Sequence, residues 1–430
     1  MLSAGENELL TRTGPGTPMG KLFRRFWLPA LLPSELPLPD CDPVRVRLLG
    51  EDLIAFRDSH GAIGFLATNC PHRGASLFFG RNEEAGLRCV YHGWKFNVSG
   101  QCVDMPNEPA ESNFKHKVQA VAYPGVDRGG LIWIYMGPKE LKPPLPDYYW
   151  CRQPDGEQRA AAKWIQDANY AQILEGNIDS AHISFLHRTF NRPGGRGLGN
   201  NAQHLTITRE TDFGFVYGAR RHAPDGKYYW RVTTFVLPTF TQIPSLSTAG
   251  NGIFTIPMDD EHTWWVYAGM NGQRLGNLAG RADTPEKVEL LTRAMSGDAN
   301  DATLGLIPGT WRKVRNQSND FLLDRAMQRT VNYTGLVGNR AQDSAVTESM
   351  GAIYDRSHEH LGTTDAAITQ MRRQLIRLAR QVDQGTEPTL PNHPDLFGAL
   401  PLDLVTDEPD FDAVWDAHYR ETLGKLRQTV

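Results

Sequence analysis

The chain has 430 residues, of which 40% are hydrophobic and 22% are charged, and its net charge is −4. This composition excludes a disordered or collagen-like chain, and the length suggests about three domains as a first expectation. The slight excess of acidic residues argues against a nucleic-acid-binding protein, because neutralising phosphates requires clustered Lys and Arg.

The N-terminal segment is polar and lacks the basic and apolar regions of a secretory signal. No stretch approaches the ~18 consecutive apolar residues that a membrane-spanning helix needs. We therefore expect a cytoplasmic protein with no membrane and no nucleic acid among its partners. The cysteines, which are too few and odd in number for a disulfide framework, are Cys41, Cys70, Cys89, Cys102 and Cys151.

Residues 43–137 contain short runs of β-branched and aromatic residues between Gly, Asp and Pro, which predicts a small all-β module. The proline-rich stretch 137–149 predicts a linker. Residues 164–187 contain one glycine and no proline, and we expect them to be helical. After a Gly-rich loop, an antiparallel sheet of at least five strands is predicted from the alternating runs 205–210, 213–221, 228–237, 252–257 and 262–270.

From about residue 317 to 385 the chain is again predicted to be helical. Asp365 is placed as a helix N-cap, and an apolar stripe at helical spacing follows it, at Ile368, Met371, Leu375, Leu378 and Val382. A sheet and long helices that occupy separate stretches of sequence indicate an α+β fold.

The β module contains Cys70-Pro71-His72 and, after the sixteen residues from Arg73 to Arg88, Cys89-Val90-Tyr91-His92. Two thiolates and two imidazoles bind either one zinc ion or a Rieske [2Fe–2S] cluster. Zinc sites usually pair like ligands, whereas each half here is mixed, which favours the Rieske cluster. In that arrangement Cys70 and Cys89 hold one iron and His72 and His92 hold the other. The remaining cysteines, Cys41, Cys102 and Cys151, are expected to be structural.

A second candidate metal site lies at Asp179, His182 and His187. On a helix Asp179 and His182 would share a face, while His187 requires the helix to end or loosen. Two His and one carboxylate form the facial triad of non-haem Fe(II) oxygenases. From the residues alone the third ligand stays open among Asp343, Glu348, Asp320 and Asp324, and Glu175 is expected to support a ligand rather than to bind metal.

The chain resembles the oxygenase (alpha) component of the Rieske non-haem iron ring-hydroxylating oxygenases, and within them the phthalate dioxygenase group. The resemblance rests on CPHRGA, CVYHGWKF, LEGNIDSAHISFLH, AQDSAVTESMG and YDRSHEHLGTTDAAI. It implies an N-terminal Rieske domain at 25–140 and a catalytic domain of helix-grip type at 141–430. It also implies His182, His187 and Asp343 as ligands of a mononuclear Fe(II), with Asp179 bridging a cluster histidine of one subunit to an iron histidine of the next.

The resemblance further implies a trimer or stacked trimers, and an oxidant at the iron that attacks an aromatic ring or a C–H bond. No G-x-G-x-x-G follows a strand, so a separate reductase must supply electrons, which in this group is an NADH-dependent flavin and iron–sulfur protein. Arg73, Arg81, Arg88 and Lys95 lie near the cluster motif and form either a docking patch for that partner or an ordinary solvated surface.

For the substrate, Arg231 lies in an otherwise apolar strand, where it could hold a carboxylate, as strand arginines do in the phthalate group. The competing interpretation is an arginine that pairs with an internal acid or lies exposed. Arg196 in the Gly-rich loop is a weaker candidate. An aromatic carboxylate is therefore the expected substrate. The alternatives are a demethylating or ether-cleaving monooxygenase on the same scaffold, an electron-transfer protein with the cluster alone, and a zinc protein.

Overall fold

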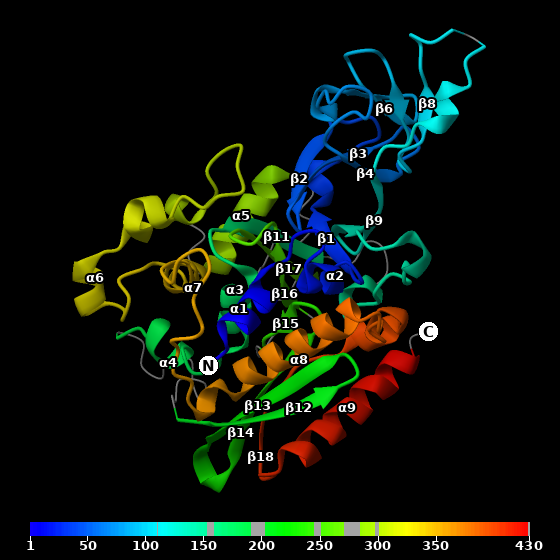
Figure 1. Ribbon diagram of the computed structural model, residues 1–430. Coiled ribbons are helices and arrows are strands. Elements are labelled where there is room, and N and C mark those ends of the chain that lie inside the picture. The colour runs from blue at the N-terminus through cyan, green and yellow to red at the C-terminus, as the bar shows by residue number, and fades with distance from the viewer. Residues whose placement is uncertain are drawn as a thin grey trace.

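The computed structural model describes residues 1–109, 111–152, 159–190, 203–244, 251–270, 284–296 and 301–428. An N-terminal module, blue to cyan in Figure 1, stands at one end of a larger C-terminal domain built from sheet and helices. The predicted combination of an all-β module with an α+β domain is confirmed.

The N-terminal module contains two antiparallel sheets. The first has the strand order β1-β10-β9-β4-β3-β2 and is formed by Trp27–Leu31 (β1), Val44–Leu48 (β2), Glu51–Arg57 (β3), Ile63–Ala67 (β4), Ala122–Arg128 (β9) and Leu131–Tyr135 (β10). The second carries the loops with the cysteine and histidine motifs and is formed by Arg81–Glu83 (β5), Gly86–Arg88 (β6), Lys95–Phe96 (β7) and Cys102–Asp104 (β8). A small core that contains Ile54, Leu66 and Phe96 lies beneath these loops.

An eight-stranded antiparallel sheet is the centre of the C-terminal domain in the described part of the chain. Its strands are Arg159–Gln166 (β11), Leu205–Thr211 (β12), Gly214–His222 (β13), Tyr228–Val236 (β14), Phe240–Gln242 (β15), Gly252–Pro257 (β16), Thr263–Met270 (β17) and Leu402–Thr406 (β18). The order is β11-β17-β16-β15-β14-β13-β12, and β18 pairs with β14. The alternating runs predicted as strands thus form β12, β13, β14, β16 and β17.

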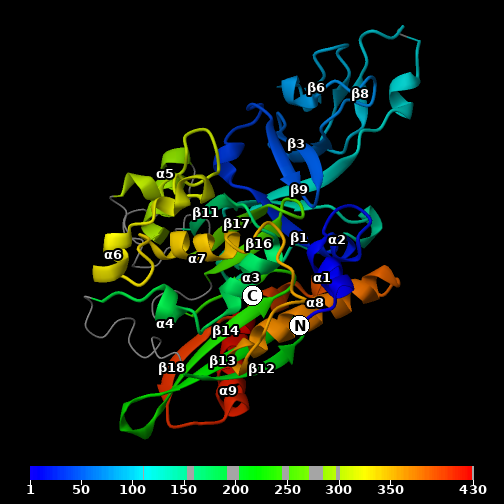
Figure 2. The ribbon, with the colours of Figure 1, turned by 60° about the vertical axis from the view of Figure 1, so that its left-hand side comes forward.

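Helices surround this sheet: Ala4–Thr11 (α1), Pro18–Phe23 (α2), Tyr170–Ile178 (α3), Ile183–Leu186 (α4), Pro285–Ser296 (α5), Arg325–Thr330 (α6), Asn339–Glu348 (α7), Ala366–Asp383 (α8) and Phe411–Gln428 (α9). The predicted stripe of α8 is confirmed, since Met371 and Leu375 are fully buried. Asp365 precedes α8 as predicted, although its side chain bonds the backbone N–H of Gly362 instead of capping α8. Helices α4, α6 and α7 gather on one side of the domain in both views (Figure 2).

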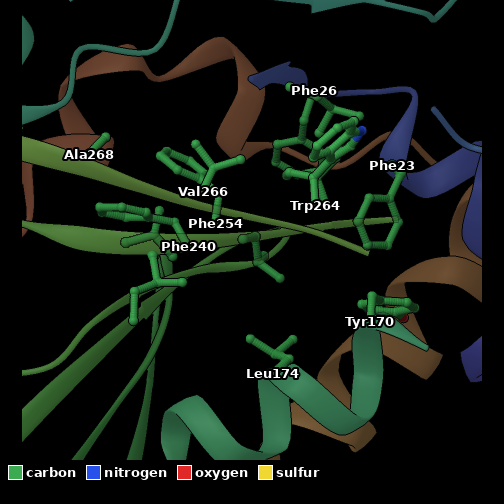
Figure 3. Close-up of a cluster of buried hydrophobic side chains, with 14 of the residues drawn as sticks. Phe23, Phe26, Tyr170, Leu174, Phe240, Phe254, Trp264, Val266 and Ala268 are labelled. Atoms are coloured by element: carbon green, nitrogen blue, oxygen red, sulfur yellow. The ribbon is translucent and has the colours of Figure 1, made fainter. Parts of the chain in front are cut away.

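The first residues of the chain pack on the C-terminal domain, which the sequence did not predict. The ring of Phe23 in α2 meets Tyr170 of α3 edge to face, with centroids 5.1 Å apart (Figure 3). The Tyr170 hydroxyl donates a hydrogen bond to the carbonyl of Leu10, and the side-chain amide of Asn169 donates one to that of Thr11. The start of the chain therefore fixes the beginning of α3, the helix that leads into the second candidate metal site.

The prediction of a helix over 164–187 is only partly right. Residues 164–166 belong to β11, which pairs with β17 in the register Trp164↔Trp265 and stacks those two rings at 3.8 Å. The helix α3 begins at Tyr170 because Asn169 caps it, its side-chain oxygen accepting from the N–H of Ala171. The sequence around residues 164–166 does not reveal this strand, because its partner β17 lies about a hundred residues further along the chain.

Part of the predicted linker at 137–149 is packed into the core. Tyr148 is buried and stacks between Trp133 and Trp150, at 5.7 Å and 4.7 Å. None of the helices in the described ranges is both long and apolar enough to cross a lipid bilayer.

Candidate metal centres

The two cysteines of the first motif lie side by side at the far end of the N-terminal module. Cys70 follows β4 and Cys89 follows β6, and both thiols are almost fully buried. Burial and, to a smaller extent, the adjacent Cys89 together raise the pKa of the Cys70 thiol to about 11. A pair of buried neighbouring thiols is the donor set that one iron or zinc ion takes as thiolates.

The two histidines of the motif complete this group. The rings of His72 and His92 lie 4.5 Å apart, and His72 stacks on Trp94 at 4.2 Å. Burial, His72 and Arg73 all lower the pKa of His92, which favours the neutral imidazole that binds metal. Both rings are half-buried, so the histidine side of the group reaches the surface of the module.

Two glycines are required in the loops that present these ligands. Gly74 has φ +78° and Gly93 has φ +77°, in the left-handed region that other residues avoid. A Cβ at Gly93 would also lie 2.6 Å from the ring of Pro106. The glycines let each loop turn back within a few residues of its Cys and His, and the four side chains fit a Rieske cluster.

The basic residues near this motif are largely neutralised within the module. The Arg88 guanidinium pairs with Glu83 and Asp104, and the amine of Lys95 pairs with Glu84. The surface around the cluster motif is instead apolar at Val90 and Tyr91, which are more than half exposed. Arg88 is therefore neutralised, and Lys95 is almost fully buried at 7% exposure, so neither forms a basic docking patch.

A break between two helices builds the second candidate site. α3 ends at Ile178, Asp179 has extended backbone angles, and His182 and His187 flank the short helix α4. Asp179 and His182 therefore do not share a helix face, contrary to the simplest sequence interpretation, but the turn brings them into contact. The expected loosening of the helix before His187 is confirmed.

His182, His187 and Asp343 converge, and their potential ligand atoms all lie within 4.8 Å of one another. Nε2 of His187 lies 3.1 Å from Oδ1 of Asp343, and Nε2 of His182 lies 3.8 Å from the same atom. Asp343 comes from α7, far along the sequence. Two imidazoles and one carboxylate fit the facial triad that binds Fe(II) and leaves positions open.

The other ring nitrogens are each held by a protein group. Nδ1 of His182 lies 3.2 Å from Oδ2 of Asp179, and Nδ1 of His187 lies 2.6 Å from Oε1 of Gln342. Such partners fix the ring orientation and the tautomer of metal-binding histidines. Both Nε2 atoms are thereby directed at the same point, which is further evidence of fit to a metal ion.

The carboxylate of Asp343 is held in its charged form. Burial acts to raise its pKa, but the hydrogen bond to His187 and the charge of Arg340 outweigh burial and hold the pKa well below its usual range. Nη1 of Arg340 lies 3.1 Å from Oδ2, which leaves Oδ1 toward the histidines. Sequence reasoning missed Arg340 and Gln342, although both lie within three residues of Asp343.

The competing acids have other partners. Asp324 caps α6 by accepting from the N–H groups of Ala326 and Met327. Glu175 is buried in ion pairs with Arg356 and Arg372, at 2.8 Å and 2.7 Å. Its partners are thus arginines, whereas the sequence had predicted that it supports a metal ligand. The remaining two acids line hollows of the protein: Asp320 lines the one beside His182, and Glu348 lines a second one.

Arg231 lies on β14 with the orientation that the alternation predicts. It pairs in register with Ala219 of β13 and with Asp403 of β18, and its neighbour Trp230 packs on Phe411 of α9 on the opposite face. The half-buried Arg231 shares its face with Arg221, whose Nη2 donates at 3.1 Å to the carbonyl and hydroxyl oxygens of Ser180. Arg196 lies outside the described residues.

A hollow of about 690 Å³ opens directly beside His182. Its wall comes from α4, α6, α7 and the short helix Gln317–Leu322 (η10). The lining is mainly apolar, and Phe185, Tyr333 and Val346 on its wall are exposed. An apolar recess of this kind next to a metal site is suited to receive a ligand or another protein surface.

Comparison with known proteins assigns both parts of the chain. Residues 26–122 match the family described as Rieske [2Fe-2S] domain, and residues 134–393 match the family described as LigXa C-terminal domain like. Among solved structures, that of dicamba monooxygenase bound to dicamba has the same fold, with a TM-score of 0.56 and 19% identity over 84% of this chain and 98% of that chain.

Three curated relatives are similar over most of their length. The 3-chlorobenzoate-3,4-dioxygenase oxygenase subunit of Comamonas testosteroni is 39% identical, over 89% of this chain and 90% of that protein. The phthalate 4,5-dioxygenase oxygenase subunit of Pseudomonas putida is 38% identical, over 87% and 86%. The 5,5'-dehydrodivanillate O-demethylase oxygenase subunit of Sphingobium sp. (strain NBRC 103272 / SYK-6) is 31% identical, over 94% and 87%.

These relatives are oxygenase subunits, a designation that implies a separate reductase as partner. Together with the two matched domains, they show that the cofactors are a Rieske [2Fe–2S] cluster and a mononuclear iron. The chain belongs to the Rieske non-haem iron oxygenases, as an oxygenase component of the group that includes phthalate 4,5-dioxygenase.

Proposed function

We propose that this chain is the terminal oxygenase of a multicomponent system that uses O2 and electrons from an NADH-dependent reductase to oxidise an aromatic carboxylate. The observation that carries the proposal is the convergence of two histidine Nε2 atoms on one oxygen of Asp343, in a chain that also has the four-ligand Rieske motif. The relatives named for chlorobenzoate and phthalate favour a carboxylated aromatic substrate.

The proposed ligands follow from the geometry of each site. Cys70 and Cys89 hold one iron of the cluster, and His72 and His92 hold the other. His182, His187 and Asp343 bind the mononuclear iron. When bound, that iron supplies the O2 chemistry, and the cluster supplies one stored electron. The division of the chain into a Rieske domain at 25–140 and a catalytic domain at 141–430 stays part of this proposal.

Asp179 is proposed to connect the two centres across a subunit boundary. Its carboxylate holds Nδ1 of His182 and accepts at 2.6 Å from the N–H of Ala181, and it reaches the surface with a fifth of its side chain exposed. Burial acts to raise its pKa, but its hydrogen bonds with His182 and the N–H of Ala181 hold the pKa below its ordinary value. A cluster histidine of a second subunit can therefore meet a charged carboxylate here.

Two apolar surfaces support assembly into a trimer or stacked trimers (a hexamer). Val90 and Tyr91 project beside His92, and the 690 Å³ hollow beside His182 carries exposed apolar residues on its wall. Seating the first surface of one subunit in the hollow of the next would bury both and bring His92 toward Asp179. Burial of apolar surface contributes ~25 cal/mol per Å² to such an assembly.

The electron donor is proposed to be a flavin and iron–sulfur reductase fed by NADH. A nicotinamide-dependent partner places the system in the cytoplasm, which we propose as the location of this chain.

The proposed substrate site lies on the sheet face that carries Arg221 and Arg231. A guanidinium binds a carboxylate through two parallel N–H bonds, and the half-buried Arg231 is not engaged in the turn at Ser180 as Arg221 is. We propose that Arg231 binds the substrate carboxylate while Arg221 holds the turn between Asp179 and His182. Arg196 stays a weaker candidate for the same role.

A second candidate activity is monooxygenation, as in O-demethylation or ether cleavage of an aromatic acid. The similarity to the 5,5'-dehydrodivanillate O-demethylase subunit favours it specifically, and the same metal ligands serve both reactions. A Rieske electron-transfer protein without oxygenase activity is a remote alternative.

The test is product analysis with ¹⁸O2. The chain is combined with a flavin and iron–sulfur reductase and NADH, and is supplied with benzoates, phthalates and methoxylated benzoates. Two ¹⁸O atoms in a cis-diol support dioxygenation, and one ¹⁸O atom with formaldehyde release supports O-demethylation. NADH oxidation that none of the aromatic acids stimulates would contradict the proposed substrate class.

A further inference from the structure

A second, polar hollow of about 580 Å³ lies between β11, η10 and the end of α7. Its lining includes three cationic and two acidic side chains, from Arg312, Lys313, Arg315, Asp167 and Glu348. Three of these, Lys313, Glu348 and Arg315, are almost fully buried, at 6%, 5% and 7% exposure. Buried ionisable groups of this kind are costly unless they are paired or functional.

Lys313 connects the hollow to the residue next to Asp343. Its Nζ donates to Oγ of Ser344 at 3.0 Å and lies 4.2 Å from the ring centre of Trp164. Oγ of Ser344 also accepts from Nε2 of Gln166 at 3.0 Å. Since two donors already point at this oxygen, the hydroxyl hydrogen of Ser344 is free to point elsewhere.

A small cavity of about 20 Å³ lies beside Ser344. Ser344 and Asp343 both line it, together with Gln166 and Asn177. A cavity of this size with several polar neighbours has room for one water molecule. Lys313, Ser344 and a water in this cavity would connect the larger hollow to the carboxylate of Asp343.

The groups that face Lys313 and Glu348 set their proton affinities. The pKa of Lys313 is lowered to about 7, mainly by burial. Arg340 also lowers this pKa, whereas Glu348 and Asp343 raise it. Burial raises the pKa of Glu348 to about 7; Asp167 also raises it, whereas Lys313 and Arg312 lower it. The pKa values of the two groups therefore lie close to each other.

Of the other charges in the hollow, Arg312 is paired with Asp167, and Arg315 with Asp301. Among the described residues no ion pair within 4.0 Å joins Lys313 to Glu348, and both side chains line the same hollow.

We propose that Glu348 and Lys313 carry protons from the polar hollow to the metal site by way of Ser344. The inference rests on the proposed function, because reducing O2 with two electrons from the reductase consumes two protons in each turnover. Protonated Glu348 gives its proton, by way of water admitted to the hollow, to the neutral Lys313 amine. The ammonium passes one proton to Oγ of Ser344 while that hydroxyl releases its own to a water in the small cavity beside Asp343, and the reduction of O2 consumes that proton. The Glu348 carboxylate regains a proton from water in the hollow.

Lys313→Arg tests this path most sharply. It keeps the positive charge behind Asp343, but arginine does not release a proton in proteins. We expect kcat at pH 7 to fall by about a hundredfold, with a larger solvent deuterium isotope effect and with iron and sulfide contents unchanged. Glu348→Gln is expected to act in the same direction.

Lys163→Arg is the matched control. Lys163 is also buried, pairs with Glu35 at 2.7 Å and lies 4.2 Å from the ring centre of Trp264. It lines none of the cavities on the proton path described above. Lys163→Arg should retain the wild-type isotope effect and pH profile.

A readout independent of turnover uses the contact of Lys313 with Trp164. Near-ultraviolet circular dichroism of the oxidised holoprotein should show a tryptophan change centred near pH 7 that Lys313→Arg abolishes. The proton path is overturned, with the proposed function left standing, if Lys313→Arg keeps the wild-type turnover and isotope effect. Persistence of the tryptophan change in Lys313→Arg would overturn it in the same way. A wild-type chain that binds no mononuclear iron overturns the path together with the proposed function.

Discussion

Nδ1 of His182 lies 3.2 Å from Oδ2 of Asp179, which directs Nε2 of the same ring toward Oδ1 of Asp343 at 3.8 Å. One imidazole thus joins a carboxylate near the surface to the proposed iron position. The same three side chains would thus serve both the proposed iron site and the proposed electron path.

Asp179→Asn should therefore keep both metal sites and lose turnover. The amide cannot carry the charge that the proposed connection requires, so we expect activity to fall by about a hundredfold, with iron content unchanged. The measurement is NADH-dependent product formation alongside iron analysis. Asp355→Asn, at an exposed ion pair with His358, serves as the control. Coupled activity at the wild-type level in Asp179→Asn would show that this carboxylate has no such role.

Gln342 should determine how tightly the mononuclear iron is held. Its Oε1 accepts from Nδ1 of His187 at 2.6 Å, and its Nε2 donates to the carbonyl of Leu336. Gln342→Met removes the partner that orients the ring, so iron affinity should fall between about tenfold and a hundredfold, while the cluster is untouched. Titration of the iron-depleted site with Fe(II) measures this.

Gln370→Met is the matched control, because Gln370 bonds Glu210 on the surface. Equal iron affinity in Gln342→Met and Gln370→Met would mean that His187 does not bind the metal through Nε2.

Arg231→Met should weaken substrate use selectively. Losing a charged partner of a carboxylate costs about 2 kcal/mol, or about thirtyfold in kcat/KM for an aromatic acid. Neutral amides of the same acids should lose much less. Arg220→Met, on the opposite sheet face where Arg220 bonds the carbonyl of Pro409, should leave kcat/KM unchanged. A similar loss for acids and amides would assign Arg231 a structural role.

The buried ion pairs of Glu175 should make stability depend on pH. Burial acts to raise the pKa of Glu175, but Arg356 and Arg372 outweigh burial and lower it. Since the folded-state pKa is lowered, the stabilisation is present above the ordinary carboxyl pKa and is lost as pH falls below it. Arg356→Met leaves Glu175 with one partner and should lower the free energy of unfolding by about 3 kcal/mol at pH 7.

The loss in free energy of unfolding caused by Arg356→Met should shrink toward pH 4, where Glu175 of the variant, with one arginine partner fewer, can be protonated. Urea unfolding at several pH values measures it. Arg377→Met, which breaks an exposed pair with Glu210, should cost at most about 1 kcal/mol. A deficit that does not change with pH would contradict the assignment to Glu175.

Strands and the long helix were readable from sequence because their signals are local. The alternation in 228–236 set which face of β14 carries Arg231, and the stripe that contains Met371 and Leu375 set the buried side of α8. The helix predicted at residues 164–166 is wrong because the pairing of this segment is not local. Their strand partner is β17, and stacking of Trp164 on Trp265 across the pair cannot be seen in a local window.

The residues of the metal site also differ in how far a local sequence pattern predicts them. His182 and His187 could be proposed from spacing, because a short helix separates them. Asp343 required the family resemblance, since only the tertiary fold brings α7 to α4. Gln342, Arg340 and Lys313 were not predicted at all, because their roles come from contacts that no sequence pattern marks.

The presence of two metal centres in one chain can be measured as iron and acid-labile sulfide per chain on anaerobically purified protein, with an electron paramagnetic resonance spectrum of the reduced form, for wild type and Asp343→Ala. We expect about three irons and two sulfides in the wild type. In Asp343→Ala we expect about two irons with the same Rieske-type signal. Two irons in the wild type, unchanged by added Fe(II), would mean that there is no mononuclear iron site and that His182, His187 and Asp343 are structural residues.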